Sequence, residues 1–369
     1  MKIGIPREIK PREGRVAMTP AGIRTLVQHG HEVLVEKGAG VGSCMPDAAY
    51  KQAGARIIDR AKTVWSDSEM VVKVKEPVEP EYSFLRKDLV LFTYLHLAAN
   101  EKLTNELLAS KVTGIAYETI QLDDGSLPLL IPMSQVAGRL AIQMGCACLE
   151  SHRGGKGILL SGVPGVRPAR VTILGAGIAG LNAAHLAVGM GAQVTILDIS
   201  QKRLNYLEDI FHSRAELLVA NIENVEESVI NADLVIASVL IPGAKAPHLI
   251  TRELLKKMEP GSAIVDIAID QGGCAETSRP TTHDNPTYIE EGIVHYCVAN
   301  MPGAVPKTST YALTNATMPY VLELADKGWK RALQENKPLA LGLNVLKGKL
   351  TNRKVAEALG KTFTPYKEG

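Results

Sequence analysis

The sequence is poor in aromatic residues and in cysteine motifs, and its charge is nearly balanced. Only 4% of its 369 residues are aromatic, and its five cysteines include no C-x-x-C pair. Their odd number and scattered spacing argue against a disulfide framework or a structural zinc site and favour buried, reduced thiols. The 41 basic and 39 acidic residues leave a net charge of +2. This balance gives no electrostatic reason to expect nucleic acid or an anionic membrane as a partner.

Long apolar segments and several common catalytic motifs are also missing. The longest apolar runs, such as LVLFTYLHLAA, fall far short of the roughly 20 residues that span a bilayer. The N-terminus, MKIGIPREIKPREGRV, alternates in charge and lacks the apolar centre of a signal peptide. The chain contains no H-E-x-x-H, no P-loop and no G-x-S-x-G. We therefore expect a cytoplasmic protein, and we predict no metal site.

The sequence does contain strand and helix patterns in alternation. Hydrophobic residues form 46% of the chain, enough for a substantial core, and its length suits two domains. Alternating strands and helices are typical of parallel βαβ units, so the predicted class is α/β with parallel, doubly wound sheets. The predicted strands cover residues 2–5, 32–40, 70–77, 89–95, 113–120, 170–177, 193–200, 216–221, 233–240, 262–270 and 293–300. The predicted helices cover residues 19–31, 47–58 and 134–151, a loop covers 152–170, and the last 60 or so residues are mainly helical.

A glycine-rich loop is the most specific motif in the chain. Gly175, Gly177 and Gly180 form G-x-G-x-x-G between an apolar strand and an apolar helix, and the next strand ends in Asp198. In this context the glycines permit a tight turn, a close approach to a pyrophosphate and close packing of helix on strand. The helix N-terminus offers free N–H groups to phosphates. Asp198 would bind both ribose hydroxyls and repel a 2′-phosphate, so NAD is predicted over NADP, although Arg203 nearby weakens this preference slightly.

Ligands of such sheets bind beyond the carboxyl ends of the strands. The segments 238–243, 266–273 and 298–306 follow later strands of the same region and should therefore line the nicotinamide side. Pro302, Gly303 and Pro306 would stiffen the last of these segments.

Polar residues at strand ends elsewhere are candidates for chemistry, although each has a simpler interpretation. Arg15 could bind a carboxylate in bidentate fashion or be a solvated loop residue. Lys75 could polarise a carbonyl or be an exposed edge lysine. His96, at the end of a strand, could be an acid/base or a packed histidine. Asp270 ends a strand of the nucleotide region and suits a cleft better than a core.

Glu118 has no evident metal partner in the sequence, and we interpret it as structural.

The chain resembles the family of alanine dehydrogenases and transhydrogenase NAD-binding subunits over nearly its full length. The resemblance lies in segments that general dinucleotide-binding enzymes do not share. They include IGIPREIKPREGRVAMTP, VVKVKEP, LFTYLHLA, IPMSQVAGRLAIQ, LGAGIAGLNAAHLAVGMGAQVTILD and NMPGAVPKTSTYALTNATMPY. The resemblance implies a discontinuous substrate domain, residues 1–127 and 308–369, and a Rossmann-type NAD domain, residues 128–307. It also implies an active site in the cleft between them and a homohexamer.

The resemblance assigns roles to individual residues. His96 and Asp270 correspond to the acid/base pair, Arg15 to the carboxylate clamp, and Lys75 to the group that binds the reacting carbonyl or amine. Tyr94, Met133 and Met301 would line a pocket for a methyl side chain. Together with the strand-end segments, the predicted NAD contacts are Ser134, Gly175, Gly177, Ile178, Ala179, Gly180, Asp198, Arg203, Ser238, Val239, Leu240, Ile267, Asp270, Arg279, Val298, Asn300 and Met301.

The implied reaction is the reversible, NAD-dependent oxidative deamination of L-alanine to pyruvate and ammonia. The main alternative is a transhydrogenase subunit that binds NAD without an amino-acid substrate. A non-catalytic NAD-binding protein and a dehydrogenase of a longer amino acid, such as lysine with a keto acid, are further alternatives. The combination of Arg15, Lys75, His96 and Asp270 favours the first interpretation, because a transhydrogenase subunit needs no amino-acid site.

Overall fold

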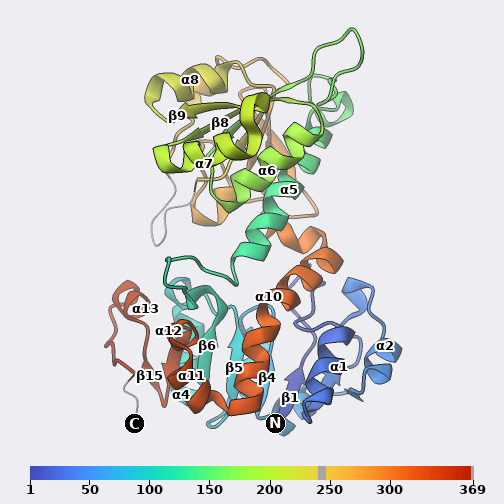
Figure 1. Ribbon diagram of the computed structural model, residues 1–369, viewed down its shortest axis with the longest axis vertical. Helices are drawn as coiled ribbons and strands as arrows, with labels where there is room; N and C mark the ends of the chain where they lie inside the picture. Colours follow the sequence, from blue (N-terminus) through green and yellow to red (C-terminus); the bar gives the residue numbers. More distant parts are fainter. Residues whose placement is uncertain (240–246, 367–369) are drawn as a thin grey trace. The chain divides into compact units, whose positions relative to one another are not determined.

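The computed structural model describes residues 1–239 and 247–366, and it divides the chain into two compact units (Figure 1). Unit 1 comprises Met1–Met133 and Val305–Gly369, and unit 2 comprises Ser134–Ala304. Each unit has a mixed, mostly parallel sheet with helices on its faces. The α/β class predicted from the sequence is therefore confirmed.

The described part of unit 1 contains an eight-stranded sheet in the order β15-β14-β6-β5-β4-β1-β2-β3. The six strands β1 to β6 are parallel, and winding changes direction between β1 and β4. The strand bounds are β1 Lys2–Ile5, β2 Glu32–Glu36, β3 Arg56–Ile58, β4 Met70–Val72, β5 Val90–Thr93, β6 Thr113–Ala116, β14 Leu343–Leu346 and β15 Lys349–Leu350.

One prediction for unit 1 is wrong and another is incomplete. Residues 56–58 were expected to be helical, but they form β3, because Gly54 takes a φ of +98° and ends the preceding helix. The C-terminal region is mainly helical as expected, but it also supplies β14 and β15, which extend the sheet in antiparallel fashion beyond β6. Both strands are short, so the alternation of apolar and polar residues along them extends over too few positions to be recognised in the sequence.

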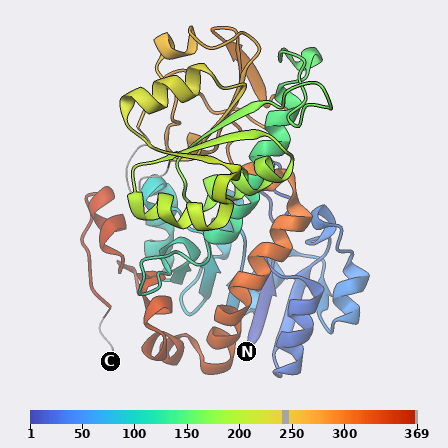
Figure 2. The ribbon, with the colours of Figure 1, turned by 45° about the horizontal axis from the view of Figure 1, so that its top comes forward.

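Helices cover both faces of the unit 1 sheet, and α1 and α10 lie side by side in Figures 1 and 2. Thr19 caps α1 as predicted, since its hydroxyl accepts a hydrogen bond from the Gly22 N–H at 3.2 Å and Pro20 follows. The helix bounds are α1 Pro20–Gln28, α2 Asp47–Gln52, α3 Ala61–Asp67, α4 Glu101–Ser110, α10 Pro306–Lys327, α11 Trp329–Glu335, α12 Lys337–Leu341 and α13 Arg353–Ala358.

The described part of unit 2 has a seven-stranded sheet in the order β12-β13-β11-β10-β7-β8-β9. Its strands are β7 Arg170–Leu174, β8 Gln193–Asp198, β9 Glu216–Val219, β10 Leu234–Ala237, β11 Ala263–Asp266, β12 Thr287–Glu290 and β13 Ile293–Tyr296. The order β9-β8-β7-β10-β11-β13 is that of a Rossmann fold, with β12 added antiparallel at the edge. The helices are α5 Ile131–Cys148, which begins in unit 1, α6 Ile178–Gly189, α7 Gln201–Phe211, α8 Ile222–Ile230 and α9 Arg252–Leu255.

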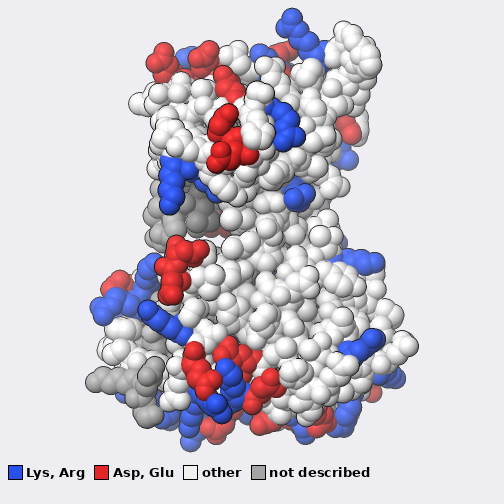
Figure 3. All heavy atoms as spheres, in the orientation of Figure 1, with Lys and Arg blue, Asp and Glu red and all other residues white. Residues whose placement is uncertain are grey.

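The cysteines are all free thiols. Cys148, Cys274 and Cys297 are buried as expected, whereas Cys146 is half-buried and Cys44 is exposed in a short turn. On the face drawn in Figure 3, basic and acidic side chains are interspersed. Among the described residues, the helices are too short or too polar to cross a membrane.

Candidate functional site

The substrate-side candidates of unit 1 follow the carboxyl ends of neighbouring parallel strands. Arg15 lies in the segment after β1, Lys75 after β4 and His96 after β5. Because β1, β4 and β5 are adjacent and parallel, these segments leave the same edge of the sheet, next to the change of winding direction between β1 and β4. Ligands of doubly wound sheets bind at such a position.

Arg15 is buried rather than solvated, so the interpretation as a surface loop residue is wrong. Its guanidinium donates to both carboxylate oxygens of Glu13, from Nε at 2.6 Å and from Nη2 at 2.5 Å. Its Nη1 lies 3.1 Å from the sulfur of Met133. Burial alone would raise the pKa of Glu13, but the hydrogen bonds from Arg15 lower it, so this buried pair is ionised. Glu13 was not among the residues predicted from the sequence.

Lys75 lies three residues beyond the end of β4, because this strand stops at Val72 rather than continuing to Lys75. Since β4 lies between β1 and β5, Lys75 is not an edge residue. Its side chain is half-buried, and burial together with the charge of Arg15 lowers the pKa of the ammonium group. A lysine in this state gives up a proton more readily than an exposed one.

Buried acidic residues hold the segment that carries Lys75. Glu8 accepts hydrogen bonds from the backbone N–H groups of Val74, at 2.6 Å, and of Lys75, at 3.3 Å. The ammonium group of Lys73 lies 3.2 Å from Glu8 and 2.7 Å from Glu81, and all three side chains are buried. Lys73 is therefore a structural cation, although strand alternation had placed it on the same face as Lys75.

Replacing Lys75 by methionine should raise the free energy of unfolding at neutral pH. There the lysine is charged in both states, so its unfavourable burial opposes folding in full. As the pH rises through the lowered folded-state pKa, the native protein loses the proton first and the penalty fades. Urea unfolding should thus show a stability gain over wild type that shrinks at alkaline pH. Methionine at the exposed Lys62 is the control, and a loss of stability in Lys75→Met would contradict the expectation.

His96 is exposed, so the interpretation as a packed histidine is wrong. Its ring stacks on that of Tyr94, with centroids 5.6 Å apart and planes within 10°. The hydroxyl of Tyr94 donates to the carbonyl of Leu129 at 2.5 Å, and burial raises the pKa of Tyr94 well above its usual value. Tyr94 is thus a fixed, neutral support for the histidine ring.

The glycine-rich loop of unit 2 has the geometry of a dinucleotide-binding turn. Gly175 has φ +89°, which suits glycine, and it directly follows β7. A Cβ on Gly180 would lie 1.9 Å from the Gly175 carbonyl oxygen, so α6 packs there only because the residue is glycine. A Cβ on Gly177 would meet no atom of the other described residues within 4 Å, apart from its own chain neighbours and the helix backbone, and this residue is the N-cap of α6 without a side-chain hydrogen bond. Space and donor groups are thus present where a pyrophosphate would bind.

Polar residues around this loop fix its shape. Asp198 is half-buried at the end of β8, and its carboxylate accepts the N–H groups of Ala176 and Ser200, each at 2.8 Å. The Nε of Arg203 donates to the Ala176 carbonyl, while its buried Nη2 has no hydrogen-bond partner among the described residues. Ser238, after β10, donates to the Gly175 carbonyl at 2.8 Å. Asp198, Arg203 and Ser238 therefore gather around the turn, and their role as NAD contacts stays a prediction.

The remaining cofactor-side candidates lie in unit 2 on segments after β11 and β13. Asp270 is exposed in the short helix Ile267–Gln271, whereas Asp266 is buried and accepts hydrogen bonds from Ser278 and Cys274. Asn300 has φ +58° and precedes the buried Met301. Val298 is buried, and three further candidates are half-buried: Val239, Ser134 and Ile267. Ile178 and Ala179 are the first two residues of α6, and Leu240 lies outside the described residues.

Arg279 is already engaged by its own unit. Its guanidinium lies 3.8 Å over the ring of Tyr288 and 3.4 Å from Glu290. An NAD contact would therefore have to share Arg279 with this pair.

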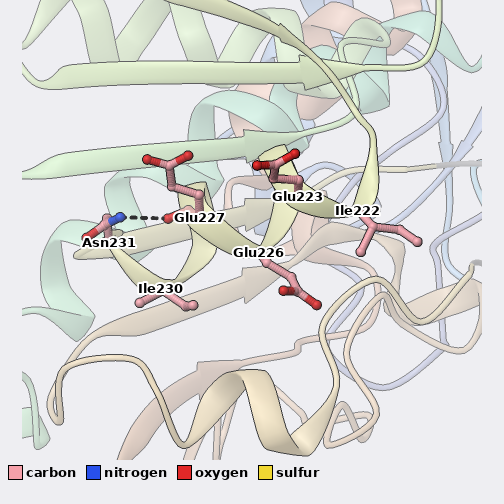
Figure 4. Close-up of a pocket in the computed structure, with 6 residues that line it drawn as sticks. All are labelled: Ile222, Glu223, Glu226, Glu227, Ile230 and Asn231. Atoms are coloured by element: carbon pink, nitrogen blue, oxygen red, sulfur yellow. Dashed lines mark hydrogen bonds between the residues drawn. The ribbon is translucent and has the colours of Figure 1, made fainter.

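A surface depression of about 550 Å³ lies along α8, and the six residues that line it include none of the predicted site residues (Figure 4). Glu223, Glu226 and Glu227 border it, which makes it a solvated acidic helix face. Among the described residues, no group of three or more His, Cys, Asp or Glu side chains is arranged to hold a metal ion.

Comparisons with known proteins place this geometry in a family. The N-terminal domain model of alanine dehydrogenase/PNT matches residues 4–137, and the C-terminal domain model matches residues 141–353. Alanine dehydrogenase of Methanococcus maripaludis is 57% identical over 99% of this chain and 98% of its own length. That of Staphylococcus epidermidis is 56% identical over 100% of this chain and 99% of its own length.

Solved structures agree with the sequence matches. An L-alanine dehydrogenase structure is 53% identical, with a TM-score of 0.95 over 98% of this chain and 99% of its own. A transhydrogenase from Sinorhizobium meliloti has a TM-score of 0.84 over 95% of this chain and all of its own, but only 24% identity, so it shares the fold alone. The resemblance predicted from the sequence is confirmed: the chain belongs to the alanine dehydrogenase/PNT family.

Proposed function

We propose that the protein catalyses L-alanine + NAD⁺ + H₂O ⇌ pyruvate + NH₄⁺ + NADH + H⁺. The observation that carries this proposal is the convergence of Arg15, Lys75 and His96 beyond adjacent strand ends of unit 1. A transhydrogenase subunit has no need of such a set. The high identity to alanine dehydrogenases over the whole chain supports the choice of substrate.

The residues of unit 1 would bind and orient the amino acid. The guanidinium of Arg15 would bind its carboxylate, sharing its donors with Glu13. Lys75, with its lowered pKa, would hydrogen-bond the amino group or the carbonyl oxygen formed from it. Tyr94, Met133 and, from unit 2, Met301 would restrict the side-chain pocket to the size of a methyl group.

Proton transfers accompany the conversion of the imine to the ketone. Bound NAD⁺ supplies a hydride acceptor for Cα, and the resulting iminopyruvate adds water. His96 would take the proton from that water and later return it to the departing nitrogen as the carbinolamine collapses. Asp270 would serve as the second acid/base. Because Asp270 and the dinucleotide loop belong to unit 2, turnover would require both units.

The fit of NAD to unit 2 rests on the open space at Gly177, the uncapped N-terminus of α6 and the position of Asp198. Each Asp198 oxygen accepts one backbone N–H, and a carboxylate oxygen can accept a second hydrogen bond from a ribose hydroxyl. We therefore propose NAD as the cofactor, with Asp198 as the group that excludes a 2′-phosphate.

Replacing Asp198 by asparagine should shift cofactor preference toward NADP. The amide oxygen can still accept one of the two backbone N–H groups that Asp198 binds, the other hydrogen bond is lost, and the negative charge that opposes a 2′-phosphate is removed. We expect the ratio of kcat/KM for NADP to that for NAD to rise by roughly tenfold or more, since like-charge contacts cost several kcal/mol. Steady-state assays with both cofactors measure this ratio. An unchanged ratio would show that Asp198 does not face the ribose.

The direct test of the proposed function is to incubate the protein with NAD⁺ and a panel of amino acids. The NADH formed is recorded by its absorbance at about 340 nm, where reduced nicotinamide absorbs. We expect NADH with L-alanine and little with lysine. NAD binding without NADH formation from any amino acid would overturn the proposal in favour of a non-catalytic protein. A signal with lysine and a keto acid alone would favour the longer substrate.

We further propose a cytoplasmic homohexamer, as the family resemblance implies. Sedimentation equilibrium of the purified protein would test the stoichiometry, and a monomer would contradict it.

A further inference from the structure

Glu118 contacts the backbone on which His96 sits. It lies in the short helix Tyr117–Thr119, which directly follows β6. Its Oε1 accepts the His96 N–H at 2.6 Å, and both of its oxygens lie 3.2 Å from the Leu95 nitrogen. One carboxylate thus binds two successive backbone N–H groups, an arrangement that suits an anion. The sequence analysis had assigned Glu118 a structural role without a partner.

The backbone that Glu118 holds is in an uncommon conformation. His96 has φ +49° and ψ +38°, in the left-handed region. A non-glycine residue adopts this region only at a cost in free energy, and the conformation persists where the surrounding structure holds it. The chain turns sharply at this residue, and the turn sets the direction in which the imidazole leaves the backbone. The hydrogen bonds from Leu95 and His96 to Glu118 offset that cost.

The neighbour of Glu118 fixes the ring of the histidine indirectly. Tyr117 packs edge-on against Tyr94, with centroids 5.0 Å apart, and against Phe92 at 4.5 Å. Tyr94 in turn stacks on His96. Two adjacent residues therefore support His96. Glu118 binds its backbone, and Tyr117 packs against Tyr94, on which its ring rests.

We propose that Glu118 is a positioning residue that acts through His96: its carboxylate fixes the left-handed turn that aims the imidazole at the reacting carbon. This inference rests on the proposed function, because it takes His96 as the acid/base. The position of an acid/base matters greatly, since a displacement of about 1 Å can lower a rate by roughly 10²-fold.

The test is a double-mutant cycle with Glu118→Gln and His96→Ala. Glu118→Gln keeps one oxygen acceptor but loses the charge, so we expect kcat for alanine oxidation to fall by roughly 10- to 100-fold, with KM for NAD unchanged. The double variant should be no slower than His96→Ala alone, because a group that acts through His96 has no effect once the imidazole is gone. The solvent deuterium isotope effect on kcat should rise in Glu118→Gln, because proton transfer then limits turnover.

Glu69→Gln is the matched control. Glu69 also accepts a backbone N–H, that of Lys2 at 2.6 Å, but it lies at the amino ends of β1 and β4. The Glu69→Gln substitution should leave kcat and the solvent isotope effect unchanged. Glu118→Asp, which keeps the charge, should recover part of the lost rate, and it replaces Glu118→Gln in the cycle if the latter does not fold.

The outcomes separate this inference from the proposed function. Wild-type kcat in Glu118→Gln, or losses that multiply in the double variant, would overturn the positioning role while leaving the dehydrogenase intact. Normal turnover in His96→Ala would instead remove the premise that His96 is the acid/base, and the positioning role would fall with it.

Discussion

Replacing His96 by alanine should lower kcat for alanine oxidation by roughly 10²- to 10⁴-fold, the usual contribution of a general acid/base. Folding should be little affected, because the side chain is exposed and its visible support, Tyr94, is held independently by the Leu129 carbonyl. The hydrogen bonds to Glu118 should also survive the substitution, because they are donated by backbone N–H groups and not by the imidazole. The loss should therefore appear in turnover and not in stability.

Steady-state kinetics and thermal unfolding together decide this prediction. Alanine at His152, which is exposed in unit 2, is the matched control and should keep wild-type kcat. Near-normal turnover of folded His96→Ala would reject His96 as the acid/base and would leave Lys75 and Asp270 as the groups to test next.

The sequence predicted the positions of the candidate groups better than their partners. Arg15, Lys75 and His96 each follow a predicted strand, and the carboxyl ends of adjacent parallel strands lie at the same edge of a sheet. It could not identify Glu13 as the partner of Arg15, because a loop between two residues can fold in many ways. Nor could it connect Glu118 to His96, since that contact depends on the register Thr93↔Ala116 between β5 and β6.

Short elements limited the prediction of the fold. Parallel strands with several β-branched residues, such as β7 and β8, were found because their apolar runs are long. The three-residue β3 and the antiparallel β12, β14 and β15 were missed, because each is too short or too polar for its period to stand out. These strands extend the edges of the two sheets, and β12 also carries Tyr288 and Glu290, which contact the predicted NAD contact Arg279.

Replacing Gly177 by alanine should weaken NAD binding strongly while leaving the fold nearly unchanged. Among the residues that the structure describes, the new Cβ meets no non-neighbouring atom within 4 Å, so this part of the protein has room for it. The same space is where a pyrophosphate must approach the backbone at the start of α6. We expect the dissociation constant for NAD to rise by roughly 10- to 100-fold, which corresponds to about 1.4–2.8 kcal/mol of binding free energy.

The stability of this variant separates a lost ligand contact from a damaged fold. Alanine is a poorer N-cap than glycine, so the free energy of unfolding without NAD should fall by no more than about 1 kcal/mol. Gly189→Ala, at the other end of α6, is the matched control, because its Cβ likewise meets no non-neighbouring atom of the described part of the chain within 4 Å. Calorimetric titration should show wild-type NAD affinity for Gly189→Ala and weak affinity for Gly177→Ala. Equal affinities would place the pyrophosphate elsewhere. Gly180→Ala, whose Cβ would lie 1.9 Å from the Gly175 oxygen, should instead lose both binding and stability, because there the space is occupied by the protein itself.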